Sequence, residues 1–302
     1  MYHRLKSLTL LLTLTIAYTA AGQERPPMPD VVAKGATPVL ISSQFKFTEG
    51  PAVDARGNVY FTDQPNDRIW KWSPREGLSL FMEGTGRSNG LYFDRNGNLI
   101  ACADLNNELW SIAPDKTVTV LVRDFEGKKL NGPNDVWVHP NGGMYFTDPF
   151  FKRDYWDRTE KEIESEDVYY LAPDRKTLRV ATTGLVKPNG IIGTPDGKTL
   201  YVADIGDGKT YAYDIEADGS LTNGRLLAEM GSDGLTIDSE GNIYLTGRGV
   251  TVFSPGGEKL GVIPIPEGWT ANVCFGGKDM KTLFITASKS VYTLKMRVKG
   301  VR

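Results

Sequence analysis

The sequence predicts an all-β fold, a six-bladed β-propeller with four strands in each blade. A short unit recurs six times, the copies begin 39 to 55 residues apart, and no sustained helical periodicity follows the first 22 residues. Self-similarity at a period of 20 to 50 residues is typical of repeat architectures. Since one unit cannot bury both faces of its own sheet, we expect the copies to pack around a common axis.

Each copy consists of a short apolar run, a turn that contains glycine, and a second apolar run. The copies occupy residues 49–63, 89–104, 134–148, 189–204, 233–247 and, more loosely, 272–286. This spacing leaves room for four short strands in each unit. Aliphatic and aromatic runs supply the third and fourth strands. Examples of such runs are Arg68–Trp72, Leu78–Met82, Thr117–Val122 and Thr210–Asp214.

The sixth unit is one strand short. After its two apolar runs and the strand-like segment Ser290–Met296, only six residues remain. The β-prone stretch Pro38–Phe47 precedes the first copy and belongs to no unit. We therefore expect this N-terminal stretch to complete the last blade and close the ring, which hides an otherwise exposed edge.

The N-terminus has the pattern of a secretory signal peptide. Arg4 and Lys6 precede the apolar stretch Leu8–Ala17, and small residues follow up to Gly22. The stretch is about half the ~20 residues that span a bilayer, and no later segment is comparably apolar, so we expect no membrane anchor. The expected organisation is a signal peptide over residues 1–22, cleaved near Gly22, and a propeller over residues 23–302, exported to the periplasm or secreted.

Composition and charge restrict the partners. Of 302 residues, 40% are hydrophobic and 24% charged, which is ordinary for a folded globular protein and excludes a disordered chain or a coiled coil. Loss of residues 1–22 removes two basic side chains and changes the formal charge from −2 to −4. An acidic surface repels phosphate backbones, so we expect a small-molecule partner and no nucleic acid. Cys102 and Cys274 are expected as two buried thiols, with a disulfide as the alternative.

A side-chain oxygen stands at the head of every copy. The six residues are Glu49, Asn89, Asn134, Asn189, Asp233 and Asn272. The first strand of each blade lines the axis of a propeller, so these positions are expected to converge at its mouth. Convergent carboxylates and amides lose hydration unless a cation satisfies them. Ca²⁺ takes six to eight oxygen ligands, whereas the scarcity of His and Cys argues against zinc.

The alternative is that these residues only form turns. Asn-Gly and Asp-Gly are turn dipeptides, which accounts for Asn89, Asn189 and Asp233. Turn chemistry does not account for Glu49 before Gly-Pro or Asn134 before Asp, and each copy has a separate glycine turn seven or eight residues later. The sequence therefore favours a ring of ligands, within the limits of a short motif.

Several motifs resemble those of the gluconolactonase and regucalcin family, six-bladed calcium propellers that also include diisopropyl fluorophosphatase. The motifs are Phe47-Thr-Glu-Gly-Pro51, Leu130-Asn-Gly-Pro-Asn-Asp135, Tyr145-Phe-Thr-Asp-Pro149, Lys187-Pro-Asn-Gly190 and Ser232-Asp-Gly234. The similarity spans nearly the whole chain after residue 22.

The resemblance implies the roles of particular residues. Glu49, Asn189 and Asp233 are expected to bind the metal directly, and Asn134 to serve as a further ligand or as a contact to the substrate. Asp233 is also implied as the base that activates water. Regucalcin-type members carry an arginine two residues before the equivalent of Asn134, where this chain has Gly132. The bacterial gluconolactonase branch, with its Asn-x-Pro-Asn-Asp motif, fits better.

The expected reaction is hydrolysis of a sugar-type lactone. A calcium ion held by two carboxylates and neutral amides keeps positive charge that can polarise the ester carbonyl. Asp233, or a water held by it, would take the proton from the attacking water. Asn89, Asn131 and Asn134 are candidates to bind substrate hydroxyls, with loop structure as the alternative for Asn89 and Asn131.

The longest gap between copies contains an aromatic and basic loop. We expect Tyr155, Trp156 and Arg158 to form a lid that contacts sugar, and the charged run 160–167 to be a solvated surface excursion. His139 lies in the turn of the third copy, where we expect a surface role. No Gly-x-Ser-x-Gly motif is present, so nucleophilic catalysis has little support.

Two other functions remain open. Tyr60-Phe-Thr-Asp63 and Tyr145-Phe-Thr-Asp148 are similar to the repeats of extracellular ligand-binding propellers, so a non-catalytic binding protein is one alternative. The other is phosphotriester hydrolysis of the diisopropyl fluorophosphatase type, because the same cation could polarise a phosphoryl oxygen. The sequence does not indicate which lactone is used, which divalent ion binds, or the oligomeric state.

Overall fold

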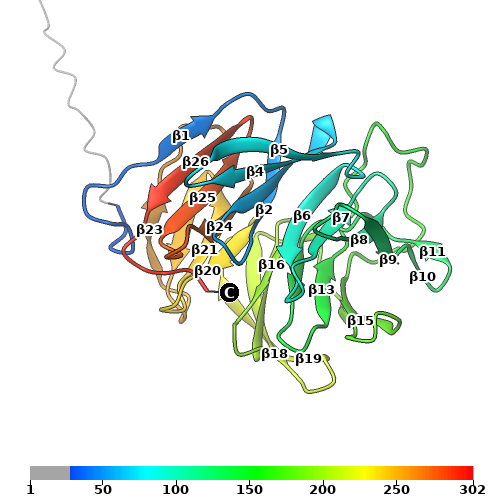
Figure 1. Cartoon of the computed structure of the whole chain (residues 1–302). Helices are drawn as coiled ribbons and strands as arrows, with labels where there is room; N and C mark the ends of the chain where they lie inside the picture. Colours follow the sequence, from blue (N-terminus) through cyan, green and yellow to red (C-terminus); the bar gives the residue numbers. More distant parts are fainter. Residues whose placement is uncertain (1–27, 302) are drawn as a thin grey trace, which may run out of the picture.

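The computed structural model describes residues 28–301, in which the chain forms six four-stranded antiparallel sheets arranged as the blades of a β-propeller (Figure 1). The predicted fold is therefore confirmed. The predicted signal peptide over residues 1–22 lies outside the described residues. No helix in the described range is long and apolar enough to cross a membrane.

Each blade runs from an inner strand at the axis to an outer strand at the rim. Blade 1 contains β2 (Thr48–Val53), β3 (Val59–Asp63), β4 (Arg68–Ser73) and β5 (Gly77–Glu83). Blade 2 contains β6 (Ser88–Phe93), β7 (Leu99–Ala103), β8 (Glu108–Ile112) and β9 (Val118–Val122). Blade 3 contains β12 (Val136–Val138), β13 (Met144–Thr147), β14 (Val168–Leu171) and β15 (Leu178–Thr182).

The second half of the ring repeats this arrangement. Blade 4 contains β16 (Pro188–Gly193), β17 (Thr199–Asp204), β18 (Lys209–Ile215) and β19 (Leu221–Ala228). Blade 5 contains β20 (Leu235–Ile237), β21 (Ile243–Gly247), β22 (Gly249–Phe253) and β23 (Lys259–Ile263). Blade 6 contains β24 (Asn272–Gly276), β25 (Thr282–Ala287) and β26 (Ser290–Lys295).

The N-terminal strand completes blade 6, as predicted. β1 (Val39–Ser42) pairs antiparallel with β26, so the sheet order is β1-β26-β25-β24 (Figure 1). Val39 lies opposite Thr293 and Leu40 opposite Tyr292. This pairing joins the two ends of the repeat region and removes the open edge that the last blade would otherwise present.

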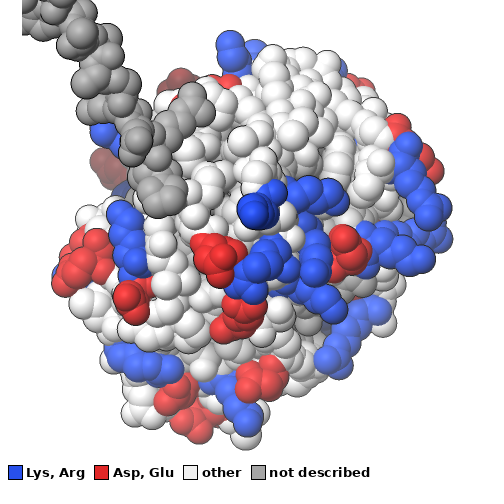
Figure 2. All heavy atoms as spheres, turned by 90° about the vertical axis from the view of Figure 1, so that its left-hand side faces the viewer, with Lys and Arg blue, Asp and Glu red and all other residues white. Residues whose placement is uncertain are grey.

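The cores lie between neighbouring blades. One apolar cluster joins blades 3, 4 and 5 through buried residues such as Trp137, Ile191 and Leu245. Cys102 and Cys274 are both free and buried, and they belong to different clusters, so the thiol expectation holds and the disulfide alternative does not. On the face viewed in Figure 2, acidic and basic side chains are mixed.

In three of the blades, a threonine of the second strand donates a hydrogen bond to the next blade. The hydroxyl of Thr62 donates to the carbonyl oxygen of Asn89 at 3.1 Å, and that of Thr147 donates to the carbonyl oxygen of Asn189 at 2.6 Å. Thr246 makes the same bond to the carbonyl oxygen of Ala271 at 2.7 Å. Each acceptor is a residue of the predicted ring or its neighbour in sequence. These bonds therefore fix the position of one inner strand along the propeller axis relative to the adjacent blade.

Two features were not predicted. A 3-10 turn, η1 (Gln64–Asn66), follows β3, and a small hairpin of β10 (Asp124–Phe125) and β11 (Lys128–Lys129) projects between blades 2 and 3. Both lie in connections that lack an apolar pattern. The hairpin has only two residues in each strand, too few for an alternation to show in the sequence.

The hairpins at the outer ends of β2 and β6 offer a matched test of ring closure. Gly57 and Gly97 occupy equivalent turns and both have positive φ (86° and 81°). In each turn the aspartate three residues before the glycine accepts the backbone N–H of the asparagine that follows the glycine. A Cβ on Gly57 would overlap the backbone of Gly277 in blade 6, whereas a Cβ on Gly97 would meet nothing within 4 Å. Gly57 also accepts the N–H of Gly277 at 2.9 Å, a contact between the first and last blades.

We predict that Gly97→Ala lowers the free energy of unfolding by about 1 kcal/mol, the cost of an L-residue in the left-handed region. Gly57→Ala should cost a further ~1–3 kcal/mol because it also forces blades 1 and 6 apart. Urea unfolding of both variants measures the difference. Equal losses would contradict the assignment of Gly57 to the closure contact.

Candidate functional site

The six predicted oxygen donors lie where the inner strands begin, at one mouth of the propeller axis. Glu49, Asn89, Asn189 and Asn272 are in β2, β6, β16 and β24, and Asn134 and Asp233 come just before β12 and β20. The inner strands contact one another in ring order, and β24 contacts β2. Asp233 is half-buried and the other five residues are buried. The six positions therefore lie at the same end of the inner strands, and their role as ligands stays a prediction.

The glycines that follow these residues allow close approach between blades. A Cβ on Gly50 would overlap the backbone of Asn89, one on Gly90 that of Asn134, and one on Gly234 the side chain of Asn272. Asn89 and Asn189 lie within strands, and the glycines after them do not have positive φ. The turn interpretation of these two Asn-Gly pairs is therefore wrong.

Asp233 is held by two donors. Asn189 Nδ2 donates to Asp233 Oδ1 at 2.9 Å, and Trp269 Nε1 donates to Oδ2 at 2.6 Å. Burial raises the pKa of Asp233 to about 6, and these two hydrogen bonds hold the pKa below the value that burial alone would give. The carboxylate is thus fixed in orientation and has a pKa near neutral pH.

Glu49 is the second carboxylate of the site. Its side chain is 4% exposed and has one hydrogen bond, from the backbone N–H of Gly50 at 3.2 Å to Oε2. Burial, and then the nearby charge of Asp233, raise its pKa well above the usual range. Asp135, at the start of β12, adds a third negative charge, and burial raises its own pKa to about 7. Because Glu49, Asp135 and Asp233 all have raised pKa values, ionising them together is unfavourable, and a nearby cation would offset this cost.

The donor set suits a hard divalent ion. Asn189 Oδ1 is buried and lacks a hydrogen-bond partner, although the amide N–H of the same side chain is used on Asp233. A buried oxygen without a donor is costly, and a cation would satisfy it. Within residues 28–301, no group of three His, Cys, Asp or Glu residues could hold an ion. A cation held here would need amide oxygens besides Glu49 and Asp233, and an all-oxygen donor set suits Ca²⁺ better than zinc.

Asn131 and Gly132 lie beside the site in a tightly bound loop. The carboxylate of Asp148 accepts the N–H of Asn131 at 2.8 Å and that of Gly132 at 2.7 Å. Asn131 Nδ2 donates to the carbonyl oxygen of Ser165 at 2.8 Å. Gly132 has φ +153°, and a Cβ there would approach Asp104 and Trp156 at 3.0 and 3.1 Å. A larger side chain at this position would therefore meet Asp104 and the loop that carries Trp156.

The aromatic loop between β13 and β14 is anchored to blades 2 and 3. The hydroxyl of Tyr155 donates to the carboxylate of Asp104, and Trp156 Nε1 donates to the Asp104 carbonyl oxygen at 2.7 Å. Arg158 Nη2 donates to the carbonyl oxygens of Leu130 and Asn131 at 2.6 and 2.7 Å. These contacts show what fixes the loop; contact of Tyr155, Trp156 and Arg158 with sugar remains a prediction.

The expectation of a solvated excursion over residues 160–167 is wrong for part of the run. Ile163 and Asp167 are buried. The carboxylate of Glu166 accepts the N–H of Phe150 at 3.0 Å and pairs with Lys187 at 3.5 Å. Charged residues here are used to tie the loop to blade 4, and charge alone does not distinguish a solvated side chain from an internally paired one.

Sequence reasoning missed Arg153, Asp104 and Trp269. Arg153 Nε pairs with Asp104 Oδ2 at 2.9 Å, and the charge of Arg153 lowers the pKa of both Glu49 and Asp233. Asp104 is the last residue of the second copy, as Asp63 is of the first, so its position in the repeat did not predict its contact with Arg153. Trp269 precedes the loosest copy, where the repeat offered no alignment.

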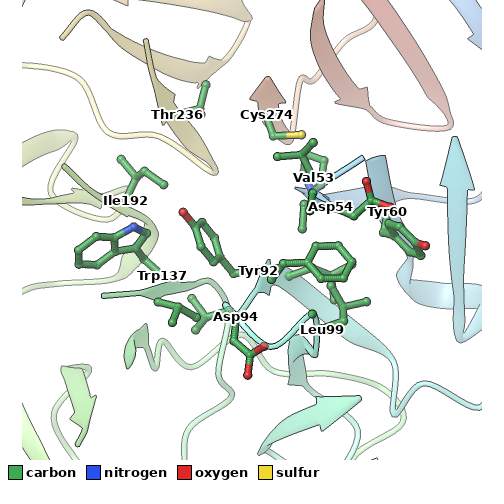
Figure 3. Close-up of a pocket in the computed structure, with 18 of the residues that line it drawn as sticks. Val53, Asp54, Tyr60, Tyr92, Asp94, Leu99, Trp137, Ile192, Thr236 and Cys274 are labelled. Atoms are coloured by element: carbon green, nitrogen blue, oxygen red, sulfur yellow. The ribbon is translucent and has the colours of Figure 1, made fainter. Parts of the chain in front are cut away.

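A channel opens at the other mouth of the axis, with a volume of about 750 Å³. Figure 3 shows one labelled residue from each inner strand around it: Val53, Tyr92, Trp137, Ile192, Thr236 and Cys274. Asp135 and Asn272 line its inner end. His139 lies at the outer rim, where Nε2 lies 3.0 Å from the carbonyl oxygen of Gly197 and Nδ1 accepts the N–H of Asn141. His139 is thus a partly exposed turn residue with local hydrogen bonds, in agreement with the expected surface role.

Comparison with known proteins identifies close similarity over the whole propeller. Residues 47–289 match the family described as SMP-30/Gluconolactonase/LRE-like region. A gluconolactonase of Zymomonas mobilis is 30% identical over 306 residues, which cover 91% of this chain and 85% of the relative. A crystal structure of a gluconolactonase-like protein is 35% identical with a TM-score of 0.84, covering 90% of this chain and 96% of its own. The structure of a gluconolactonase from Xanthomonas campestris is 29% identical with a TM-score of 0.81, covering 88% and 91%.

The buried acids generate a prediction about stability. In the absence of a divalent cation, folding buries Glu49 at a position where its charge is unfavourable, while the unfolded chain leaves it hydrated. At neutral pH the isosteric Glu49→Gln removes this cost, so the metal-free variant should melt at a higher temperature than the metal-free wild type. Added Ca²⁺ should raise the Tm of the wild type and leave that of the variant unchanged.

Thermal melts in chelator and in millimolar calcium test both parts, with Glu258→Gln on the exposed rim of blade 5 as the control. An equal calcium response in wild type and Glu49→Gln would remove Glu49 from the proposed cation site.

Proposed function

The chain belongs to the SMP-30/gluconolactonase/LRE-like family, and from this premise we propose that it is a hydrolase that opens a sugar-type lactone with the help of a divalent cation, most simply Ca²⁺. The observation that carries the proposal is the buried Glu49 and the half-buried Asp233 beside an Asn189 oxygen that has no hydrogen-bond partner. The gluconolactonases of Zymomonas mobilis and Xanthomonas campestris support the substrate class.

Four residues would hold the cation: Glu49, Asn134, Asn189 and Asp233. When bound, the cation supplies positive charge that polarises the lactone carbonyl and stabilises the oxyanion. The two ends of the Asn189 amide would have different roles. Nδ2 donates to Asp233 and orients its carboxylate, and Oδ1, which has no hydrogen-bond partner, would bind the cation. The Asn134 side chain is buried on the neighbouring blade, where it could complete the set or contact the substrate.

Asp233 is the proposed general base. Its carboxylate accepts a proton from the water whose oxygen attacks the carbonyl carbon. The ester C–O bond then breaks, and the ring oxygen leaves as a hydroxyl after taking up a proton, so the product is the open hydroxy acid. Trp269 and Asn189 keep the carboxylate in one orientation during this transfer.

Asn89 and Asn134 are proposed to bind substrate hydroxyls at the mouth. The case for Asn131 is different, because its side chain is fully buried and its amide N–H is used on Ser165. This contact favours the loop-structure alternative that the sequence left open. Export to the periplasm or secretion remains a proposal from the first 22 residues alone.

We predict that Asp233→Asn lowers kcat for glucono-1,5-lactone by at least about 10²-fold, the usual contribution of a positioned base. A pH-stat assay of purified protein in calcium measures the loss, and chelator should abolish wild-type turnover. Asp196→Asn, in an exposed turn of blade 4, serves as the control and should keep full activity. A wild type that cleaves a phosphotriester and no lactone, or one that turns over nothing, would reject the proposal.

Trp269→Phe keeps an aromatic side chain of smaller size and removes the Nε1 donor to Asp233. We expect about a tenfold loss of kcat with a smaller change in KM, because the base loses its orientation while the substrate contacts remain. Unfolding by urea should show little change relative to the wild type. Full activity of Trp269→Phe would show that Asn189 alone orients the base.

A further inference from the structure

We infer that the substrate carries an anionic group, such as a phosphate, sulfonate or second carboxylate, which binds in a basic pocket beside the mouth. The inference rests on the proposed lactone hydrolysis and specifies the class of lactone. The basic pocket is a cavity of about 550 Å³ whose walls include Lys46, Arg87, Lys152, Arg153, Asp154 and Tyr155.

The charge of the basic pocket is only partly compensated by ion pairs. Arg153 pairs with Asp104, but in the described part of the chain no ion pair joins Lys46, Arg87 or Lys152 to a carboxylate. The only acid among the lining residues is Asp154, which is exposed. A protein with a formal charge of −2 therefore concentrates three free cations at one site. Clefts with one sign of charge attract ligands of the opposite sign.

Arg87 is held in place before any ligand binds. Its backbone has φ 47°, an uncommon conformation for a residue other than glycine, and Asp67 Oδ1 fixes it by accepting its N–H at 2.6 Å. The guanidinium lies 4.4 Å from the centre of the Tyr155 ring and donates from Nη1 to the carbonyl oxygen of Pro65 at 3.1 Å. A fixed guanidinium with free N–H groups is suited to bidentate binding of an oxyanion.

Asp104 has different hydrogen-bond partners from the aspartates at the same position in other blades, and two of its partners line the basic pocket. The terminal aspartates of three other second strands, Asp63, Asp148 and Asp204, each accept backbone N–H groups from the loop before their own inner strand. In blade 2 the equivalent N–H of Arg87 is taken by Asp67 instead. Asp104 is thereby free to bind Arg153 and Tyr155, which places both on the wall of the pocket.

The basic pocket lies beside the mouth of the axis. Arg153 and Gln64, both in its wall, bind Asp104 Oδ2. The other oxygen of Asp104 lies 3.0 Å from a Cβ built on Gly132, two residues before Asn134. A substrate with its ester at the axis can therefore extend a substituent past Arg153 toward Arg87, Lys46 and Lys152. Neutral hydroxyls gain little from three cations, whereas an anionic substituent gains charge-assisted hydrogen bonds.

The test compares kcat/KM for glucono-1,5-lactone with that for three charged lactones, which carry a 6-phosphate, a 6-sulfonate or a 6-carboxylate. We expect at least a tenfold preference for one or more charged lactones in low salt, and a smaller preference in 0.5 M salt. The ranking of the three identifies the anion.

Variants of the basic pocket test whether its side chains cause the preference for charged lactones. Arg87→Met and, separately, the exposed Lys152→Met should each reduce kcat/KM for the preferred charged lactone about tenfold, mainly through KM, and leave the neutral lactone within twofold. Lys198→Met, an exposed lysine in the turn between β16 and β17, should change neither.

Two results would overturn the inference in distinguishable ways. Turnover of the neutral lactone with no preference for any charged one, and no effect of Arg87→Met or Lys152→Met, would reject the anionic substituent while the lactonase proposal stands. Failure to hydrolyse any of the four lactones would reject both.

Discussion

The structure depends on holding two carboxylates, one buried and one half-buried, near each other at the end of the propeller axis. Glu49 and Asp233 come from blades 1 and 5. Burial raises the pKa of both carboxyls, and the charge of Asp233 raises that of Glu49 further. The two carboxylates receive different numbers of hydrogen bonds. Asp233 receives side-chain donors from Trp269 and Asn189, whereas Glu49 has only the N–H of Gly50. The uneven arrangement fixes the orientation of Asp233, as the proposed general base requires, and leaves Glu49 with a raised pKa that a cation would lower.

Such an arrangement survives only in a rigid frame, and the frame is the ring itself. The threonine bonds between blades and the glycines that let strands approach closely set the position of every inner strand relative to the next. Closure by β1 and the contact of Gly57 with Gly277 make that constraint circular, so no blade can relax outward alone. Local opening that would hydrate Glu49 and Asp233 must therefore disturb two interfaces at once. The stability of the fold is what holds the repulsive site in place.

The repeat made the fold and the ring of donors predictable, because both follow from equivalent positions. Glu49, Asn189 and Asp233 could be found by aligning the copies, and the strand that completes blade 6 followed from counting what was missing. Residues outside the repeat could not be found that way. Trp269 lies in the connection before the loosest copy, and Arg153 lies in the long loop, where a basic residue has many alternative surroundings. The run 160–167 was misread because an internally paired Glu166 and a solvated one have the same sequence signature.

Repetition also conceals function when one copy is put to a different use. Asp63, Asp104, Asp148 and Asp204 are equivalent by position, and three of them bind the backbone of their own blade. Asp104 does not, because Asp67 of the preceding blade already holds the N–H of Arg87. One aspartate in a short loop thus releases another, and the released carboxylate fixes Arg153 and Tyr155 between the axial acids and a group of free cations. Substrate selection in this propeller can therefore change through a loop contact between blades while the acids at the axis stay the same.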